Sequence, residues 1–260
     1  MDSLWIAKTG LDAQQTRMAV VSNNLANVNT VGFKRGRPVF EDLLYQNVAQ
    51  AGAKTSQDTQ NPTGMNMGTG VRISGTEKNF AQGSTVQTGN QLDAAINGRG
   101  FFQVQLPDGE LAYTRDGSFK VDSNGRLVTG SGYEIQPAIS VPDGVQSLSI
   151  AEDGIIEADV AGSAAPITIG TLQIADFINP AGLQAEGQNL FVETAASGTP
   201  QIGTPGLDGL GTLDQGALEG SNVNVVEELV SMIETQRAYE MNSKAISTSE
   251  QMLQYLNNNL

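Results

Sequence analysis

The sequence predicts an α+β protein in which helices at the two ends of the chain pair with each other and enclose a β-rich middle. Two observations lead to this prediction. Apolar residues recur at steps of seven near both termini, a repeat typical of helices that pack along a partner helix. Between the termini, short alternating runs are separated by Asx-Gly dipeptides, which favour hairpins. We expect a coiled-coil inner domain, an extended linking arm or hairpin, and a sandwich- or barrel-like outer domain.

The composition excludes several classes of function. The 260 residues include no cysteine and no histidine, so disulfides, thiolate metal sites and a histidine general base are excluded. A net charge of −14 argues against nucleic-acid binding. The sequence has no run of eighteen apolar residues, so no membrane span is predicted. The N-terminal residues carry no apolar signal core. We expect any route out of the cytoplasm to need no ordinary secretory signal.

A helix is predicted over residues 3–28, within an N-terminal segment 1–30. One apolar row consists of Leu4, Leu11, Met18 and Leu25. The polar positions are mostly Gln, Asn, Ser and Thr, which suits burial between subunits better than a free surface. The alternative is an ordinary amphipathic helix packed on its own domain.

The end of this helix is rich in asparagine. Asn23, Asn24 and Asn27 can cap, bind backbone groups or form side-chain ladders across an interface. Gly32 permits a turn, after which Phe33 anchors the chain. The alternative is a helix C-terminus with turn residues. The basic cluster Lys34-Arg35-Gly36-Arg37 either meets an acidic partner surface or flanks a solvated turn.

Residues 31–72 are interpreted as a linking arm. A short apolar group at 40–45 precedes the polar stretch Gln46–Gly70. Composition alone favours a flexible linker; the other interpretation is a long hairpin that folds only against neighbouring subunits.

Residues 73–219 form the predicted β-rich domain. Turn dipeptides at a spacing near ten residues favour a sandwich or a partly closed barrel. The turns are Asn97-Gly98, Asp108-Gly109, Asp116-Gly117, Asn124-Gly125, Asp143-Gly144 and Asp153-Gly154. The predicted strands are Gly100–Leu106, Ala112–Arg115, Ser118–Val121, Arg126–Thr129, Tyr133–Ile139, Ser147–Ile150, Ile167–Ile169, Leu172–Phe177 and Leu190–Glu193.

The terminal segment 220–260 holds the longest period in the chain. Asn224 can cap a helix from Val225 to about Asn257, with Glu227 in a capping-box position. An apolar row of Val225, Met232, Tyr239, Ile246 and Leu253 follows its length. We assign self-assembly to Leu4, Leu11, Met18, Leu25, Asn23, Asn24, Asn27, Gly32, Phe33, Val225, Leu229, Met232, Ile233, Tyr239, Ile246 and Leu253.

No motif predicts catalysis, a cofactor or a metal site. Paired carboxylates can cleave glycosidic bonds, but here the Asp residues that precede Gly are explained as hairpin turns. Asp122-Ser123-Asn124-Gly125 matches only half of a calcium loop. The expected protein is therefore an assembly subunit rather than an enzyme.

Three motifs resemble the flagellar rod and hook axial family. SNNLANVNTVGFK (Ser22–Lys34) is similar to that family's N-terminal signature, Ser221–Ile246 to its C-terminal signature, and residues 98–137 to its β domain. Length and the polar stretch Gln46–Thr63 are most similar to distal-rod members, in which this stretch is linked to a straight, stiff rod.

The resemblance implies a structural subunit without cofactors that self-assembles in a helical array and transmits torque. The paired helices would line an export channel, and the β domain would face outward. Implied partners are proximal rod subunits, hook-side axial proteins, the surrounding periplasmic and outer-membrane rings and the flagellar export apparatus. The implied location is the basal body, in the rod across the periplasm. Alternatives are a hook or proximal rod subunit, and, from other classes, a secreted β-rich adhesin with coiled-coil ends or a wall-degrading enzyme.

Overall fold

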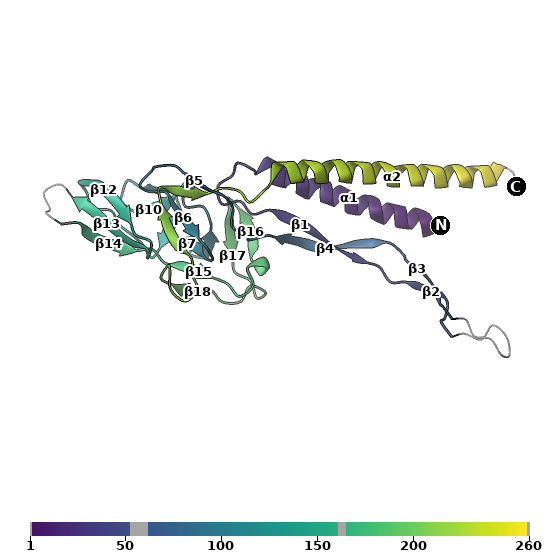
Figure 1. Cartoon of the computed structure of the whole chain (residues 1–260), viewed down its shortest axis with the longest axis horizontal. Helices are drawn as coiled ribbons and strands as arrows, with labels where there is room; N and C mark the ends of the chain where they lie inside the picture. The colour runs from purple at the N-terminus through teal and green to yellow at the C-terminus, as the bar shows by residue number, and fades with distance from the viewer. Residues whose placement is uncertain (1, 53–61, 161–164, 259–260) are drawn as a thin grey trace. The chain divides into compact units, whose positions relative to one another are not determined.

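The computed structural model describes residues 2–52, 62–160 and 165–258, and its elements are drawn in Figure 1. Along the chain, a helix at each end flanks a β-rich middle, so the α+β class is confirmed. The chain divides into two compact units. Unit 1 comprises Met1–Ala26, Gly36–Glu77 and Asn224–Leu260, and unit 2 comprises Asn27–Arg35 and Lys78–Val223.

Unit 1 is built on two helices, α1 (Asp2–Ala26) and α2 (Val225–Asn258). The start of α2 is where the sequence places it, because the side chain of Asn224 accepts a hydrogen bond from the amide of Val226 at 3.1 Å. The end of α1 differs from the prediction. This helix stops at Ala26, two residues before the expected position, because the asparagines that follow favour turns over a helix.

The remainder of unit 1 is a two-stage hairpin. Strand β1 (Gly36–Asp42) pairs with β4 (Val71–Lys78), and β2 (Gln46–Ala49) pairs with β3 (Met65–Met67). Two ion pairs join β1 to β4: Arg37–Glu77 at 2.8 Å and Arg72–Glu41 at 2.7 Å. The described part of the arm is therefore a hairpin rather than the flexible linker that composition favoured. Residues 53–61 of the polar stretch lie outside the described residues.

Unit 2 is built on a nine-stranded antiparallel sheet. Seven strands follow the order β16-β17-β8-β7-β11-β10-β9, while β15 pairs with β7 and β18 pairs with β15. The bounds are β7 Phe101–Gln105, β8 Leu111–Thr114, β9 Phe119–Val121, β10 Leu127–Thr129, β11 Glu134–Gln136, β15 Ile174–Asp176, β16 Gln184–Gly187, β17 Leu190–Val192 and β18 Gln201–Gly203.

Three smaller sheets complete unit 2. One has three strands in the order β12-β13-β14, and the others pair β6 with β19 and β5 with β20. Each of the nine predicted strand segments overlaps one observed strand. A short 3₁₀ helix, Pro180–Gly182, precedes β16. The bounds are β5 Thr85–Gln87, β6 Ala94–Asn97, β12 Val145–Ile150, β13 Ile155–Val160, β14 Ile167–Thr171, β19 Thr212–Gln215 and β20 Ala217–Glu219.

Only half of the predicted turn dipeptides close a hairpin. Asp108-Gly109, Asn124-Gly125 and Asp153-Gly154 each join two strands that pair with each other. Asp116-Gly117 instead connects β8 to β9, which are not neighbours in the sheet. Glycine is needed there for close approach, because a Cβ atom on Gly117 would overlap the carbonyl of Ala94.

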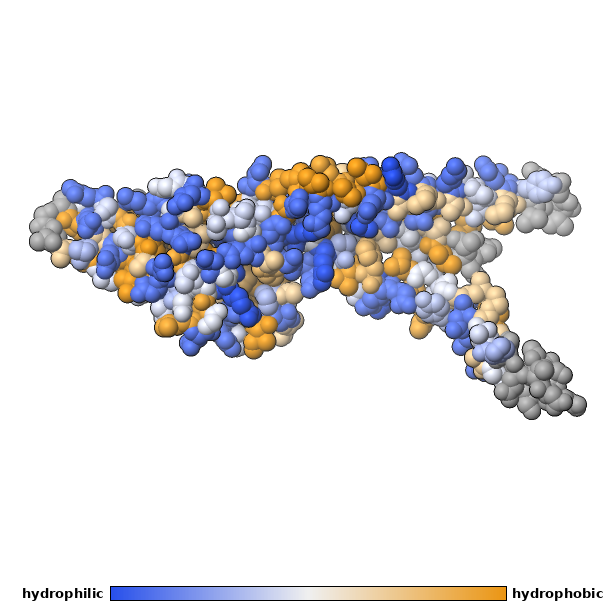
Figure 2. All heavy atoms as spheres, in the orientation of Figure 1, coloured by the Kyte–Doolittle hydropathy of each residue, from blue (hydrophilic) through white to orange (hydrophobic). Residues whose placement is uncertain are grey.

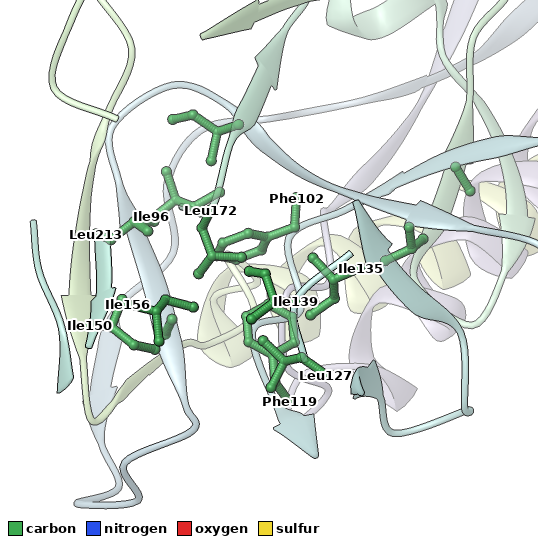
Figure 3. Close-up of a cluster of buried hydrophobic side chains, with 14 of the residues drawn as sticks. Ile96, Phe102, Phe119, Leu127, Ile135, Ile139, Ile150, Ile156, Leu172 and Leu213 are labelled. Atoms are coloured by element: carbon green, nitrogen blue, oxygen red, sulfur yellow. The ribbon is translucent and has the colours of Figure 1, made fainter. Parts of the chain in front are cut away.

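Two apolar clusters form the core of unit 2. In the larger one, drawn in Figure 3, Phe102 meets Phe119 edge to face with ring centroids 4.9 Å apart. The smaller cluster holds Phe101, Tyr113 and Phe177. Both clusters are made entirely of residues from unit 2, so this unit buries its own apolar side chains.

Candidate assembly surface

The helices of unit 1 run antiparallel. Asn24 Nδ2 donates to Glu228 Oε2 at 3.3 Å, and Arg17 lies 3.7 Å from Glu234. Further along, a Cβ atom on Gly10 would lie 3.0 Å from the side chain of Asn242. Residue numbers thus rise along one helix as they fall along the other, and a small residue lets the two backbones approach.

The face that α2 turns toward α1 is polar. Glu228 and Thr235 are buried, and Asn242 and Ser249 are half-buried one and two heptads further on. Thr235 satisfies its hydroxyl within its own helix by donating to the carbonyl of Ser231 at 2.6 Å. On α1, the buried Gln14 Oε1 has no hydrogen-bond donor among the described residues. This contact buries few large apolar side chains and contributes little hydrophobic stabilisation.

The predicted apolar row of α2 faces elsewhere. Met232 and Ile246 are half-buried, whereas Val225, Tyr239 and Leu253 are exposed. Leu229 and Ile233 are exposed as well, by 43% and 51%. Hydrophobic side chains gather over the first turns of α2 (Figure 2). Most of the candidate residues on α2 are therefore available to another chain.

The predicted row of α1 is half-buried along its length, at Leu4, Leu11, Met18 and Leu25. The most buried apolar residues of this helix are instead Ala13 and Val21. Helix α1 also contacts the hairpin, where Thr9 Oγ1 accepts a hydrogen bond from the amide of Val71 at 3.4 Å. The row is thus only partly used inside the chain.

Of the asparagines, Asn24 has a role within the chain. Its side chain donates to the carbonyl of Gly36 at 2.8 Å and accepts from the amide of Gly36 at 2.9 Å. It therefore ties the last turn of α1 to the start of β1. Asn23 is exposed, and Asn27 accepts a hydrogen bond from the Thr30 hydroxyl. An interface role for these residues stays a prediction.

Gly32 and Phe33 belong to unit 2. Gly32 has φ +68°, and a Cβ atom there would lie 2.8 Å from the amide nitrogen of Asp116. Only glycine fits this left-handed, crowded position. Phe33 is buried, and Lys78 Nζ lies 4.4 Å from the centre of its ring.

The interpretation of the basic cluster was wrong for Lys34. Its side chain is 0% exposed and its Nζ lies 2.6 Å from Glu219 Oε1, while Arg115 lies 3.2 Å from Glu219 Oε2. Burial lowers the pKa of Lys34, and the neighbouring Glu219 carboxylate opposes that effect. Lys34 therefore neither meets a partner surface nor flanks a solvated turn, because it forms part of a buried ion cluster inside unit 2. Arg37 pairs with Glu77 on the hairpin surface.

Nothing in the described part of the chain resembles a catalytic or metal centre. Across residues 2–52, 62–160 and 165–258, no three acidic side chains gather as metal ligands would. Neither helix is long and apolar enough to cross a membrane. The exposed apolar residues of the helix pair are the feature that requires a functional explanation.

Comparisons with known proteins place three segments in related families. Residues 4–34 match the model for flagella basal body rod proteins, and residues 95–158 match the D1 domain of the flagellar hook protein FlgE/F/G family. Residues 214–259 match the C-terminal model of flagellar basal body rod FlgEFG proteins. These segments include both terminal helices and the centre of unit 2.

Several relatives that align over nearly the whole chain are described as flagellar basal-body rod protein FlgG. The protein from Buchnera aphidicola of Schizaphis graminum is 59% identical, and the alignment covers 98% of each chain. That from Borreliella burgdorferi is 50% identical over 99% of this chain and 98% of its own. That from Bacillus subtilis is 38% identical over 98% of each. The similarity therefore extends over both units and all segments that connect them.

Proposed function

The chain belongs to the flagellar basal-body rod protein family and is a structural subunit of the distal rod, and we propose that it polymerises through its two terminal helices. The relatives are structural proteins, and we assign this chain no catalytic role. The adhesin and wall-degrading alternatives have no support in the comparisons.

The proposal rests on the difference between two faces of α2, one that contacts α1 and one that is exposed. Its contact with α1 uses Glu228 and Thr235, whereas Val226, Val230 and Ile233 are at least half exposed. A chain in solution rarely keeps such large apolar side chains uncovered without an interaction to make. Helices of further copies are the partners that fit, because a seven-residue repeat is typical of helix-to-helix packing.

Family membership supports the finer parts of the proposal. Subunits leave the cytoplasm through the flagellar export apparatus and join a helical array in the periplasm. The helix pairs form the inner wall of the export channel, the β unit faces the surrounding rings, and the array transmits torque. The hairpin β1–β4 and the polar stretch beyond it brace neighbouring copies and keep the rod straight. Proximal rod subunits and hook-side axial proteins meet the two ends of the array.

A pair of single substitutions tests the role of α2. Ile246→Asp and Leu253→Asp each place a carboxylate on the proposed interface, so neither variant is expected to form tubes under electron microscopy when the unmodified chain does. Circular dichroism is expected to show an intact β unit. Gln254→Asp adds the same charge at an exposed polar neighbour and serves as the matched control. Tubes of normal diameter from either variant would contradict the proposal.

Limited proteolysis gives a second, independent readout. In the free subunit, cleavage is expected first in the terminal segments 1–30 and 225–260, because the fully buried residues of α2 at their contact, Glu228 and Thr235, are polar. Polymerisation is expected to protect these segments while the digestion of unit 2 stays unchanged. Termini as resistant as unit 2 in a verified monomer would show that the helix pair needs no neighbour.

A further inference from the structure

The exposed apolar residues of the helix pair are most concentrated near its two ends, and Tyr239 and Met241 are also exposed between them. The outermost stripe of α2, followed at steps of three and four, begins with Val226, Val230 and Ile233. It continues through Arg237, Glu240 and Lys244, then Thr248 and Gln251, and reaches Tyr255. The stripe thus starts apolar, becomes charged, and ends on an aromatic ring.

The second apolar end combines both helices. Because the helices are antiparallel and Gly10 lies beside Asn242, the first turns of α1 lie beside about residues 245–250, just before the last turns of α2. Trp5 is 54% exposed and Ile6 38% exposed at the start of α1, and Met252 and Tyr255 are exposed near the end of α2. We call Val226, Val230 and Ile233 the aliphatic end and Trp5, Ile6, Met252 and Tyr255 the aromatic end.

The two ends cannot cover each other within one copy. Ile233 and Met252 are nineteen residues apart on one continuous helix, a separation of about 28 Å at 1.5 Å per residue. The two ends also differ in chemistry, since one has branched aliphatic side chains and the other has large flat or flexible ones. Different patches at opposite ends of one body suit a heterologous contact, which repeats into an open polymer.

Charge favours joining unlike ends. At the aromatic end, Lys8 lies with its Nζ 5.5 Å from the centre of the Trp5 ring. Beside the aliphatic end, Glu234 is exposed, with only a 3.7 Å contact to Arg17. A lysine at one end and a glutamate at the other attract when unlike ends meet, whereas like ends would bring two lysines or two glutamates together.

We propose that the aromatic end of one copy docks on the aliphatic end of the next, with Trp5 and Ile6 packed on Val226, Val230 and Ile233 and with Lys8 facing Glu234 of that second copy. Copies then join head to tail in one direction. This inference rests on the proposed function, because it specifies which parts of the terminal helices meet when the chain polymerises.

The absence of cysteine makes cross-linking a clean test. A full-length chain with Lys8→Cys and Glu234→Cys is polymerised and treated with a short bis-maleimide. Within one copy, Lys8 lies beside the turn of α2 near Lys244, so positions 8 and 234 are about 15 Å apart along the helix axis. The cross-linker must therefore be shorter than this distance. A head-to-tail contact is expected to give a ladder of covalent dimers, trimers and longer species on a denaturing gel.

Single-cysteine variants supply the control. Lys8→Cys alone and Glu234→Cys alone are each expected to remain monomeric on the gel, and a mixture of the two is expected to give one cross-linked dimer and nothing larger. If each single variant forms its own dimer and the mixture adds no new band, like ends meet and the inference is overturned. A polymer in which the double variant gives no ladder also overturns it.

Charge reversal tests the same contact without a reagent. Lys8→Glu is expected to raise the protein concentration needed for polymerisation about tenfold, and adding Glu234→Lys to the same chain is expected to restore it. Failure of the double variant to recover would count against the pairing. If the unmodified chain forms no polymer at all, the proposed function falls together with this inference, whereas normal polymers without the ladder remove only the inference.

Discussion

The helix pair of unit 1 and the sheets of unit 2 differ in where they hold their large apolar side chains. Ile174 and Phe102 of unit 2 are 0% exposed, whereas Val230 and Ile233 of α2 are both 51% exposed. The fully buried residues of α2 are instead the polar Glu228 and Thr235. Unit 2 therefore buries its core within its own chain, whereas the exposed apolar side chains of unit 1 would gain hydrophobic stabilisation only in the proposed assembly.

The largest expected effect within unit 2 comes from its buried ion cluster. Glu219→Ala removes the acceptor of Lys34 and Arg115 and leaves two cations buried without their carboxylate. We expect a loss of about 3–5 kcal/mol in the free energy of unfolding, measured by urea denaturation of the monomer. The double variant Glu219→Ala with Lys34→Met is expected to lose less, because one of the cations is gone. A loss below about 1 kcal/mol would mean that water reaches the cluster.

A matched pair of isoleucines compares the two units directly. Ile174→Ala in the core is expected to cost about 2–5 kcal/mol of monomer stability, because it removes fully buried methyl groups. Ile233→Ala on α2 is expected to change monomer stability by no more than about 0.5 kcal/mol. Denaturation of each monomer and the concentration required for tube formation are the two measurements.

The polymer is expected to reverse this ranking. Ile233→Ala should raise the concentration required for tubes, while Ile174→Ala should leave it unchanged at temperatures where the variant stays folded. Equal losses of monomer stability from the two substitutions would show that α2 is already packed in the free chain.

Tyr113 tests how firmly unit 2 excludes water at high pH. Its ring is buried, and burial, together with the carboxylate of Glu193, raises the pKa of Tyr113 from 10.0 to about 12. Because the folded-state pKa lies above the unfolded value, the stabilising contribution of the neutral ring is complete below pH 10 and is lost as the pH rises to about 12.

Phenylalanine at this position has no proton to lose. Between pH 10 and 12, Tyr113→Phe is therefore expected to lose about 2–3 kcal/mol less stability than the unmodified chain. Urea denaturation at a series of pH values measures the difference between the two chains. Parallel profiles for the two chains would show that the ring ionises equally easily in both states.

In both units, local sequence patterns predicted where helices and strands lie better than they predicted which elements pair with each other. Alternating runs located strands such as β7 and β17, and Asn224 located the start of α2, because these signals lie within a few neighbouring residues. The order β16-β17-β8 depends on pairing between residues such as Phe191 and Tyr113, far apart in sequence, and no local pattern specifies it. Strand β13 was missed although Asp153-Gly154 precedes it.

Of the candidate assembly surface, the sequence analysis singled out the apolar row of α2 but not its polar row. The row through Met232 and Ile246 led to the prediction that α2 is an assembly helix, which stays a prediction, and it did not indicate which face of α2 meets α1. That face is the polar row beginning at Glu228 and Thr235, whose period of seven is equally visible in the sequence. Lys34 was misread because its partner Glu219 lies 185 residues away. A lysine next to other basic residues is usually solvated, and only the fold reveals the carboxylate.

The most local expected effect concerns the cap of α2. Asn224→Ala removes the side-chain acceptor of the Val226 amide, and such caps contribute about 1 kcal/mol. Because α2 gains little from its polar contact with α1, the loss is expected to stay local and to appear as faster amide hydrogen exchange in the first turns of α2. Exchange in β7 is expected to remain unchanged, and Asn224→Ser is expected to keep most of the protection. An equal acceleration in β7 would show that the two units unfold together. Since the same turns present Val226 and Val230, fraying them should also weaken polymerisation, which links this minor change in the free chain to the proposed assembly surface.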